Sequence, residues 1–209
     1  MNMLTQGNHI KTEICSSIQN RIRSGEYKPG EKLSENLLAT EFNCSRMPVR
    51  EALKHLEQDG LVIIQPKSGT YVREYSQEEI CHALEIRAYL EALAFALVIE
   101  KNVDIGVMEE QIEKMRACIE GENFDLSSFG ECHLKFHETM IMLAGNLFLS
   151  DLYNKLHLNA LQKIFFDPMT KEEMIFTHEE HQKILQYIKD KNPEGEQFIK
   201  MHLWKRRNS

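Results

Sequence analysis

Two hydrophobic periods follow one another along this chain of 209 residues. After residue 45, apolar side chains recur at the spacing of a helix. Two short apolar runs come next, at residues 61–65 and 69–72, and the polar turn Pro66-Lys67-Ser68 joins them. Such runs are typical of a β-hairpin. A second helix is predicted just before, over residues 34–42. With one further helix ahead of these two, the pattern indicates three helices and a hairpin in the first part of the chain.

The pattern changes near Tyr75. Ser76 and Glu79 have the spacing of a capping box, which predicts the start of a long helix that runs to about Lys101. From there to the end only helices are predicted, over residues 107–120, 126–144, 147–166, 171–189 and 193–206. We therefore expect a mainly α protein with two domains. Residues 1–75 form a winged helix-turn-helix, and residues 76–209 form an all-helical bundle.

The helix that starts near Ser45 carries the candidate chemistry of the first domain. Its apolar positions would be buried, which leaves Arg46, Met47 and Arg50 on the outer surface. Ser45 stands at the N-cap position, where its hydroxyl can also donate to a phosphate, and Pro48 falls in the first turn. Two arginines on a helix are often only a solvated face. In the third helix of a winged helix-turn-helix, however, they would face a major groove.

The motifs of this segment resemble those of the GntR family of bacterial transcription regulators. Residues 27–35, YKPGEKLSE, are similar to its entry motif, and residues 45–53, SRMPVREAL, to its recognition element S-R-T-P-V-R-E-A-L. Residues 60–62 and 69–72 match its wing, and the resemblance covers residues 9–73. It implies binding to a double-stranded DNA operator through Ser34, Asn36, Ser45, Arg46, Met47, Pro48, Arg50, Lys67 and Gly69. Met47 replaces a small hydroxyl residue of the family, and Asn36 replaces a frequent arginine, so the operator sequence stays open.

Four histidines of the second domain fall on predicted inner faces. His133 and His137 are four residues apart and share one helix face, while His181 and His202 lie on later helices. Buried imidazoles need partners. One divalent metal ion would use all four, whereas separate hydrogen bonds to backbone carbonyls would serve each one alone. Spacing leaves both alternatives open.

Residues 76–204 resemble the FCD effector domain found in one subgroup of GntR regulators. The similar motifs are Phe136-His137 followed by residues 144–146 (AGN), residues 180–184 (EHQKI), and His202. Through them the resemblance implies that His137, His181 and His202 are metal ligands. The fourth ligand of the family is an aspartate, which this chain replaces by His133. Four imidazoles favour zinc, nickel or copper over harder ions, and we expect zinc or nickel.

Arg87 matches the arginine of the family motif R-x-x-L-E. The resemblance suggests that its guanidinium holds a small carboxylate effector, since arginine binds carboxylates with two hydrogen bonds. The alternative is a surface ion pair between Arg87 and Glu91, which are four residues apart on a helix.

Charge and composition agree with a cytoplasmic regulator. The net charge of −7 divides unevenly: residues 1–75 carry 10 Lys+Arg against 9 Asp+Glu, and residues 76–209 carry 15 against 23. Phosphate attraction must therefore come from local placement of cations. The five cysteines are scattered and form no C-x-x-C, which favours a reduced protein. No basic start leads into an apolar run, and no stretch has the length of a membrane helix.

We expect a homodimeric repressor that binds a palindromic operator and senses a small organic acid. Dimerisation follows because one module buries too little surface for specific binding. Two alternatives stay open. One is a metal-responsive DNA-binding protein without an organic ligand. The other is a metal-dependent enzyme, although the chain contains no H-E-x-x-H motif and no evident general base.

Overall fold

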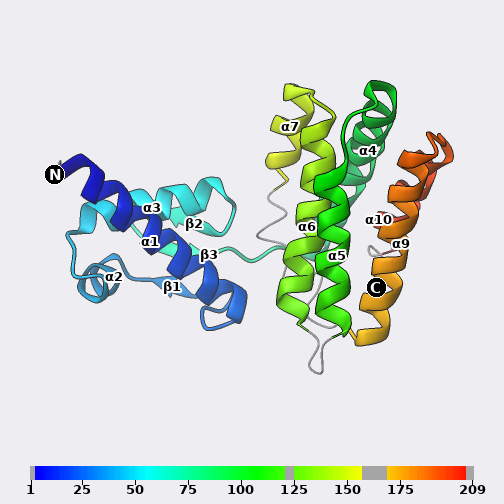
Figure 1. Ribbon diagram of the computed structural model, residues 1–209. Helices are drawn as coiled ribbons and strands as arrows, with labels where there is room; N and C mark the ends of the chain where they lie inside the picture. The colour runs from blue at the N-terminus through cyan, green and yellow to red at the C-terminus, as the bar shows by residue number, and fades with distance from the viewer. Residues whose placement is uncertain (1–2, 121–124, 157–168, 206–209) are drawn as a thin grey trace. The chain divides into compact units, whose positions relative to one another are not determined.

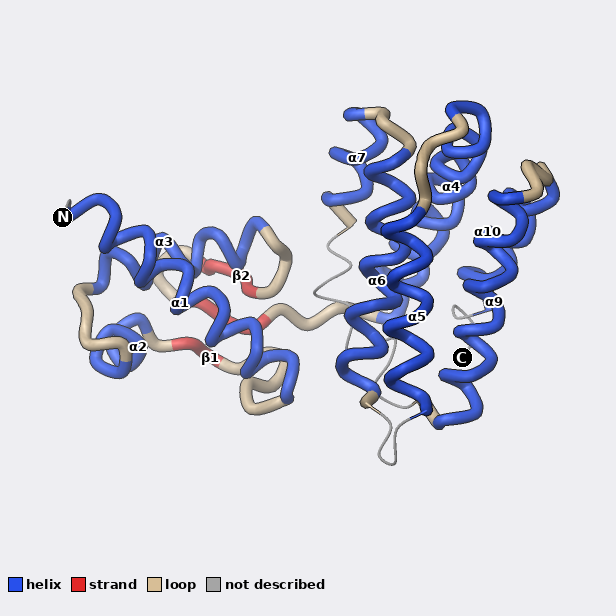
Figure 2. Tube along the Cα trace, in the orientation of Figure 1, coloured by secondary structure: helices blue, strands red, loops and turns tan. Residues whose placement is uncertain are grey.

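The computed structural model describes residues 3–120, 125–156 and 169–205. Contacts within the chain cluster into two compact units, Met1–Tyr75 and Ser76–Ser209. The elements of each unit are drawn in Figure 1, and Figure 2 distinguishes helices from strands. Among the described residues, none of the helices combines the length and the apolar character that crossing a bilayer requires.

The first unit is the expected winged helix-turn-helix. Its elements in chain order are α1 (Met3–Ser24), β1 (Lys32–Leu33), α2 (Glu35–Glu41), α3 (Arg46–Gln58), β2 (Val62–Gln65) and β3 (Gly69–Val72). The strands pair antiparallel in the order β1-β3-β2, with Ile63 opposite Tyr71 in the hairpin. Strand β1 is an addition to the predicted elements, because two residues are too short for a sequence period.

Helix α3 packs its apolar face on α1, α2 and β2. The four residues of that face are completely buried: Val49, Ala52, Leu53 and Leu56. Ser34 caps α2 by accepting a hydrogen bond from the Leu37 amide. Gly60 ends the turn after α3 with a φ of 72°, a conformation that glycine adopts without strain.

The second unit is the expected helical bundle. Its described helices are α4 (Gln77–Lys101), α5 (Gly106–Glu120), α6 (Leu126–Leu143), α7 (Leu147–Asn154), α9 (Lys171–Lys189) and α10 (Glu194–Lys205). Helix α4 contacts α6, α7, α9 and α10, which explains why its buried residues lie around much of its circumference. Gly195 lets α10 approach α4 closely, because any Cβ there would collide with the Phe95 ring.

The helix predicted over residues 147–166 is wrong as a single element. Helix α7 ends at Asn154, and Lys155 is its C-cap. The Leu156 amide donates to the Tyr153 carbonyl, a tighter pattern than that of an α-helix, so this turn closes the helix. Residues 157–166 of the predicted range lie outside the described residues.

The start of α7 explains the sequence Ala144-Gly145-Asn146. Gly145 has a φ of 59° and donates to the Met142 carbonyl, which terminates α6. Asn146 then caps α7 through the Leu149 amide. Lys101 from the end of α4 donates to the Ala144 carbonyl at 2.5 Å. These contacts fix the end of the helix that carries His133 and His137.

Candidate metal centre and nucleic-acid interface

The exposed start of α3 is the candidate nucleic-acid interface. Arg46, Met47 and Arg50 are exposed, as the sequence predicts, and Met47 retains 75% of its surface. Ser45 is the N-cap residue, yet its side chain makes no capping hydrogen bond to α3. Pro48 lies in the first turn of α3. An open hollow beside this turn is lined by residues of α2 and the turn: Asn36, Ala39, Thr40, Asn43, Cys44, Ser45 and Arg46.

Arg50 has a partner that sequence patterns did not indicate. Its Nη2 lies 2.9 Å from Oε2 of Glu35, and its Nε lies 3.3 Å from Oε1. The pairing lowers the pKa of Glu35 below its usual value. A two-point contact orients the guanidinium on the surface of the unit. Because Glu35 follows Ser34 at the start of α2, the two helices jointly place this arginine.

The remaining predicted DNA contacts lie on the hairpin. Lys67 is exposed in the β2–β3 turn with a φ of 63°. Gly69 is half-buried with a φ of 132°, and a Cβ at this position would lie 2.7 Å from Cε of Lys32. The Lys32 side chain is flexible and could move aside, so the φ of Gly69 is the reason for a glycine at this position.

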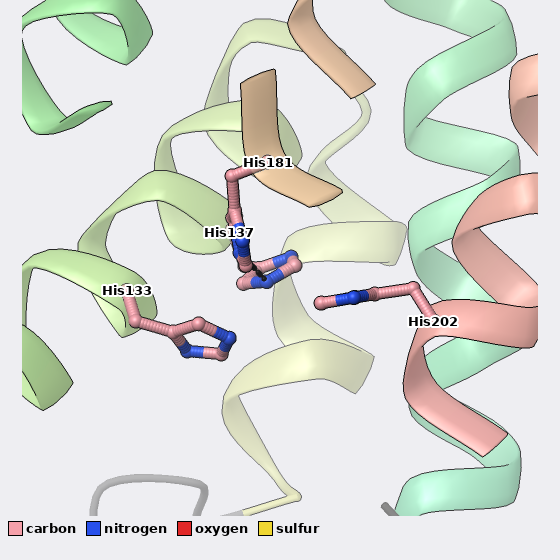
Figure 3. Close-up of side chains that lie close together, drawn as sticks. All are labelled: His133, His137, His181 and His202. Carbon is pink, nitrogen blue, oxygen red and sulfur yellow. Dashed lines mark hydrogen bonds between the residues drawn. The ribbon is translucent and has the colours of Figure 1, made fainter. Parts of the chain in front are cut away.

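The second unit brings the four predicted histidines together. His133 and His137 come from α6, His181 from α9 and His202 from α10, and their rings converge inside the bundle (Figure 3). All four are buried, with exposures of 0 to 1%. One potential ligand atom from each lies within 4.8 Å of the others. Two nitrogens bonded to one ion at about 2.0–2.1 Å are at most about 4.2 Å apart, so the cluster is only slightly wider than one ion requires.

The outer nitrogens of three histidines face hydrogen-bond acceptors. Nδ1 of His181 lies 2.6 Å from the carbonyl of Thr177, and Nδ1 of His202 lies 2.7 Å from Oε2 of Glu180. Nδ1 of His137 lies 2.5 Å from Oε2 of Glu91. A carbonyl or a carboxylate can only accept, so the neutral rings of His181 and His202 carry their proton on Nδ1 and keep a lone pair on Nε2. This is how metal-ligating histidines are commonly oriented. The contact between His137 and Glu91 is close, but its geometry is not that of a hydrogen bond.

A short contact inside the cluster tests whether a metal fits. Nε2 of His137 and Nε2 of His181 lie 2.9 Å apart. Nδ1 of His181 faces a carbonyl and carries the proton of that ring, so a hydrogen bond between the two Nε2 atoms needs the His137 proton on Nε2. With the His137 proton on Nδ1, beside Glu91, two lone pairs would face each other, and a cation bound by both nitrogens would remove that conflict. The contact is compatible with either arrangement, and four buried imidazoles that converge on one point fit a metal ion.

Glu91 and its neighbours form a buried polar network beside the histidines. Its Oε1 accepts from Arg87 Nε at 2.6 Å and from the Tyr153 hydroxyl at 2.9 Å. Burial raises the pKa of Glu91, but Arg87 and His137 outweigh burial and lower that pKa to about 2. Burial lowers the pKa of His137 to about 4, so its ring is neutral at neutral pH. The same burial, with the charge of Glu91, raises the pKa of Tyr153 well above its usual value.

Arg87 combines parts of both sequence-based alternatives. It pairs with Glu91 as the spacing allows, but the two side chains are 1% and 0% exposed, so a surface ion pair is wrong. Among the described residues, no hydrogen bond reaches its Nη2, although that atom is buried. A buried donor of this kind favours an additional acceptor. Of the supporting residues, Glu91 had a sequence signal in its spacing from Arg87 and Glu180 stood in the motif of residues 180–184, whereas Tyr153 had no signal.

Comparisons with known proteins agree with both units. The model for bacterial regulatory proteins of the gntR family matches residues 10–72, and the FCD domain model matches residues 82–203. The HTH-type transcriptional regulator YdhC of Bacillus subtilis is 29% identical over 189 residues, with 88% of this chain and 82% of that protein covered. The gluconate operon transcriptional repressor of the same organism is 30% identical over 145 residues, covering 68% of this chain and 58% of the repressor.

The fold has solved counterparts. The structure of a GntR transcriptional regulator from Rhodococcus sp. RHA1 matches with a TM-score of 0.78 at 21% identity, and 95% of each chain is covered. The matching domains and relatives are those of transcription regulators and not of enzymes. The metal-dependent enzyme considered from the histidine pattern is therefore not supported.

Proposed function

Because the chain belongs to the GntR family of bacterial regulatory proteins and carries an FCD domain, we propose that it is a metal-dependent repressor. It binds a palindromic operator as a homodimer in the cytoplasm, and a small carboxylate controls its affinity for DNA. The observation that carries the proposal is the convergence of four oriented histidines inside the helical unit of a chain whose other unit exposes a recognition helix.

The DNA-binding part of the proposal rests on α3. Exposed Arg46 and Arg50 on its first turns suit base or phosphate contacts in a major groove, while its opposite face is buried. The set of DNA-contacting residues is Ser34, Asn36, Ser45, Arg46, Met47, Pro48, Arg50, Lys67 and Gly69. A two-fold operator requires a two-fold protein, which is why we propose a dimer.

The effector part rests on the helical unit. His133, His137, His181 and His202 would hold a divalent transition metal, zinc or nickel. When bound, such an ion attracts carboxylate oxygens. Arg87 supplies the second anchor, because its Nη2 is buried and has no hydrogen bond among the described residues. A carboxylate that reaches both would be held at two points.

The proposal is tested by DNA binding with defined metal content. Fluorescence anisotropy of labelled DNA from the promoter region of its own gene is measured with chelator-treated protein and with zinc- or nickel-loaded protein. Acetate, malate and citrate are then added as probes. We expect specific binding that changes on carboxylate addition to nickel-loaded protein and does not change on addition to chelator-treated protein. Sedimentation of the complex gives its stoichiometry, and one protomer per operator would contradict the dimer.

A specific observation favours a second candidate, a metal sensor without an organic ligand. Four protein ligands fill the coordination sphere of a tetrahedral zinc ion, and such closed sites are structural. In that case the metal itself changes DNA affinity, and carboxylates have no effect with any ion. The same titration separates the two candidates.

A further inference from the structure

Two buried carboxylates contact the histidine cluster from outside. Glu180 on α9 is 7% exposed and holds Nδ1 of His202 at 2.7 Å. Glu91 on α4 is 0% exposed and approaches Nδ1 of His137 at 2.5 Å. Neither residue is a candidate ligand. Each faces the side of an imidazole that points away from the centre of the cluster.

The lack of negative charge among the four histidines suggests a role for these carboxylates. Four neutral imidazoles bring no negative charge, so a divalent ion among them would place two positive charges inside a buried bundle. A buried charge is costly unless an opposite charge lies close. Glu180 and Glu91 lie one imidazole away from the centre. The charge of Glu91 is partly neutralised by Arg87, whose Nε lies 2.6 Å from Oε1 of Glu91.

We infer that Glu180 and Glu91 are positioning residues of the metal centre, which fix the orientation of two ligands and supply the negative charge that an all-histidine site lacks. The inference rests on the metal centre proposed above. It predicts that metal affinity depends on the charge of Glu180 and not only on its ability to accept a hydrogen bond.

Glu180 offers the sharper test, because Glu91 also binds Arg87 and Tyr153 and its replacement disturbs both. Glu180→Gln keeps an oxygen that accepts from His202 but removes the charge, whereas Glu180→Ala removes both. Zinc affinity is measured by competition with a chromophoric chelator at fixed pH and ionic strength. Loss of an outer partner typically weakens metal binding by about 10- to 100-fold. We expect Glu180→Gln to lose at least about tenfold and Glu180→Ala to lose more.

Glu179 provides the matched control. It precedes Glu180 on the same helix but is exposed, so Glu179→Gln should keep the zinc affinity of the unchanged protein within about twofold. Circular dichroism in the presence of chelator checks that each variant is folded. If Glu180→Gln does not fold, Glu91→Gln gives the same test, since it also removes one negative charge beside the cluster and keeps an oxygen that can accept.

A second set of variants, made in protein that already carries His133→Asp, separates the effect of the Glu180 charge from the effect of Glu180 on the orientation of His202. His133→Asp places a carboxylate directly at the cluster, so the charge of Glu180 should matter less. In that background we expect Glu180→Gln to cost less than about threefold in zinc affinity, against at least about tenfold alone. An unchanged affinity of Glu180→Gln, or an equal loss in both backgrounds, overturns the inference. Absence of zinc binding by the unchanged protein instead overturns the metal centre itself.

Discussion

Removing the metal from the helical unit should lower its melting temperature by about 10 °C. The four histidines come from α6, α9 and α10, so the ion binds only when these helices are packed together. Binding that is specific for the folded state stabilises it by about 2.7 kcal/mol when the free ion is at roughly 100 times its Kd. A unit of about 130 residues unfolds with an entropy of about 0.27 kcal/mol/K, which converts that energy to about 10 °C.

The assay follows the helical signal of tag-free protein on heating, first after chelation and then with zinc restored. His181→Ala is the variant of choice, because the ring of His181 lies 4.6 to 4.9 Å from the rings of the other three histidines. It should abolish the zinc-dependent shift while the first unit still binds DNA non-specifically. His82→Ala is the control, since the side chain of His82 is 62% exposed and outside the cluster.

Two results together would refute the reasoning. One is a melting temperature that rises by less than about 2 °C when zinc or nickel is added. The other is elemental analysis that finds less than about a tenth of an equivalent of any transition metal. The four residues would then be core histidines, and the short contact between His137 and His181 would need a shared proton instead of an ion.

Other consequences concern the DNA interface and the metal. Arg50→Ala should weaken specific operator binding by roughly tenfold or more in anisotropy at fixed salt if the arginine reads a base; unchanged affinity would make it part of a solvated surface. Met47 is apolar and exposed, so selection from random DNA should return a tolerant or thymine-preferring position, and strict G or C at every half-site position would contradict this. His133→Asp should retain metal but shift competition titrations towards harder ions such as manganese, and an unchanged metal preference would count against a ligand role for His133.

Much of the fold was predictable because apolar residues recur regularly at helical spacing. The buried face of α3 and the inner face of α6 follow helical spacing, and the capping box at Ser76 is present as predicted. The break after Asn154 was not predictable, because it depends on a local turn in a segment that contains neither glycine nor proline. Strand β1 was missed since two residues carry no period.

The candidate site was predictable within single helices but not between them. Spacing within one helix placed His133 with His137 and Arg87 with Glu91, but contacts between helices had no such signal. Glu180 and His202 are 22 residues apart, and Tyr153 and Glu91 are 62 apart. Sequence left open whether Arg87 binds a ligand or pairs with Glu91 on the surface, because burial of α4 depends on the helices that surround it.

The identity of the ion should decide whether a carboxylate acts on this protein. Four histidines would complete the four-ligand set that zinc prefers, whereas nickel or copper could take a further ligand beside them. We therefore expect malate or citrate to change DNA affinity with nickel-loaded protein and to have no effect with zinc-loaded protein. Arg87→Met should remove the nickel-dependent response without releasing the metal, because Arg87 contacts Glu91 and none of the histidines directly in the described network. An equal change of DNA affinity with both ions would mean that one histidine dissociates from the zinc when the carboxylate binds. His133→Ala would then test whether that histidine is His133.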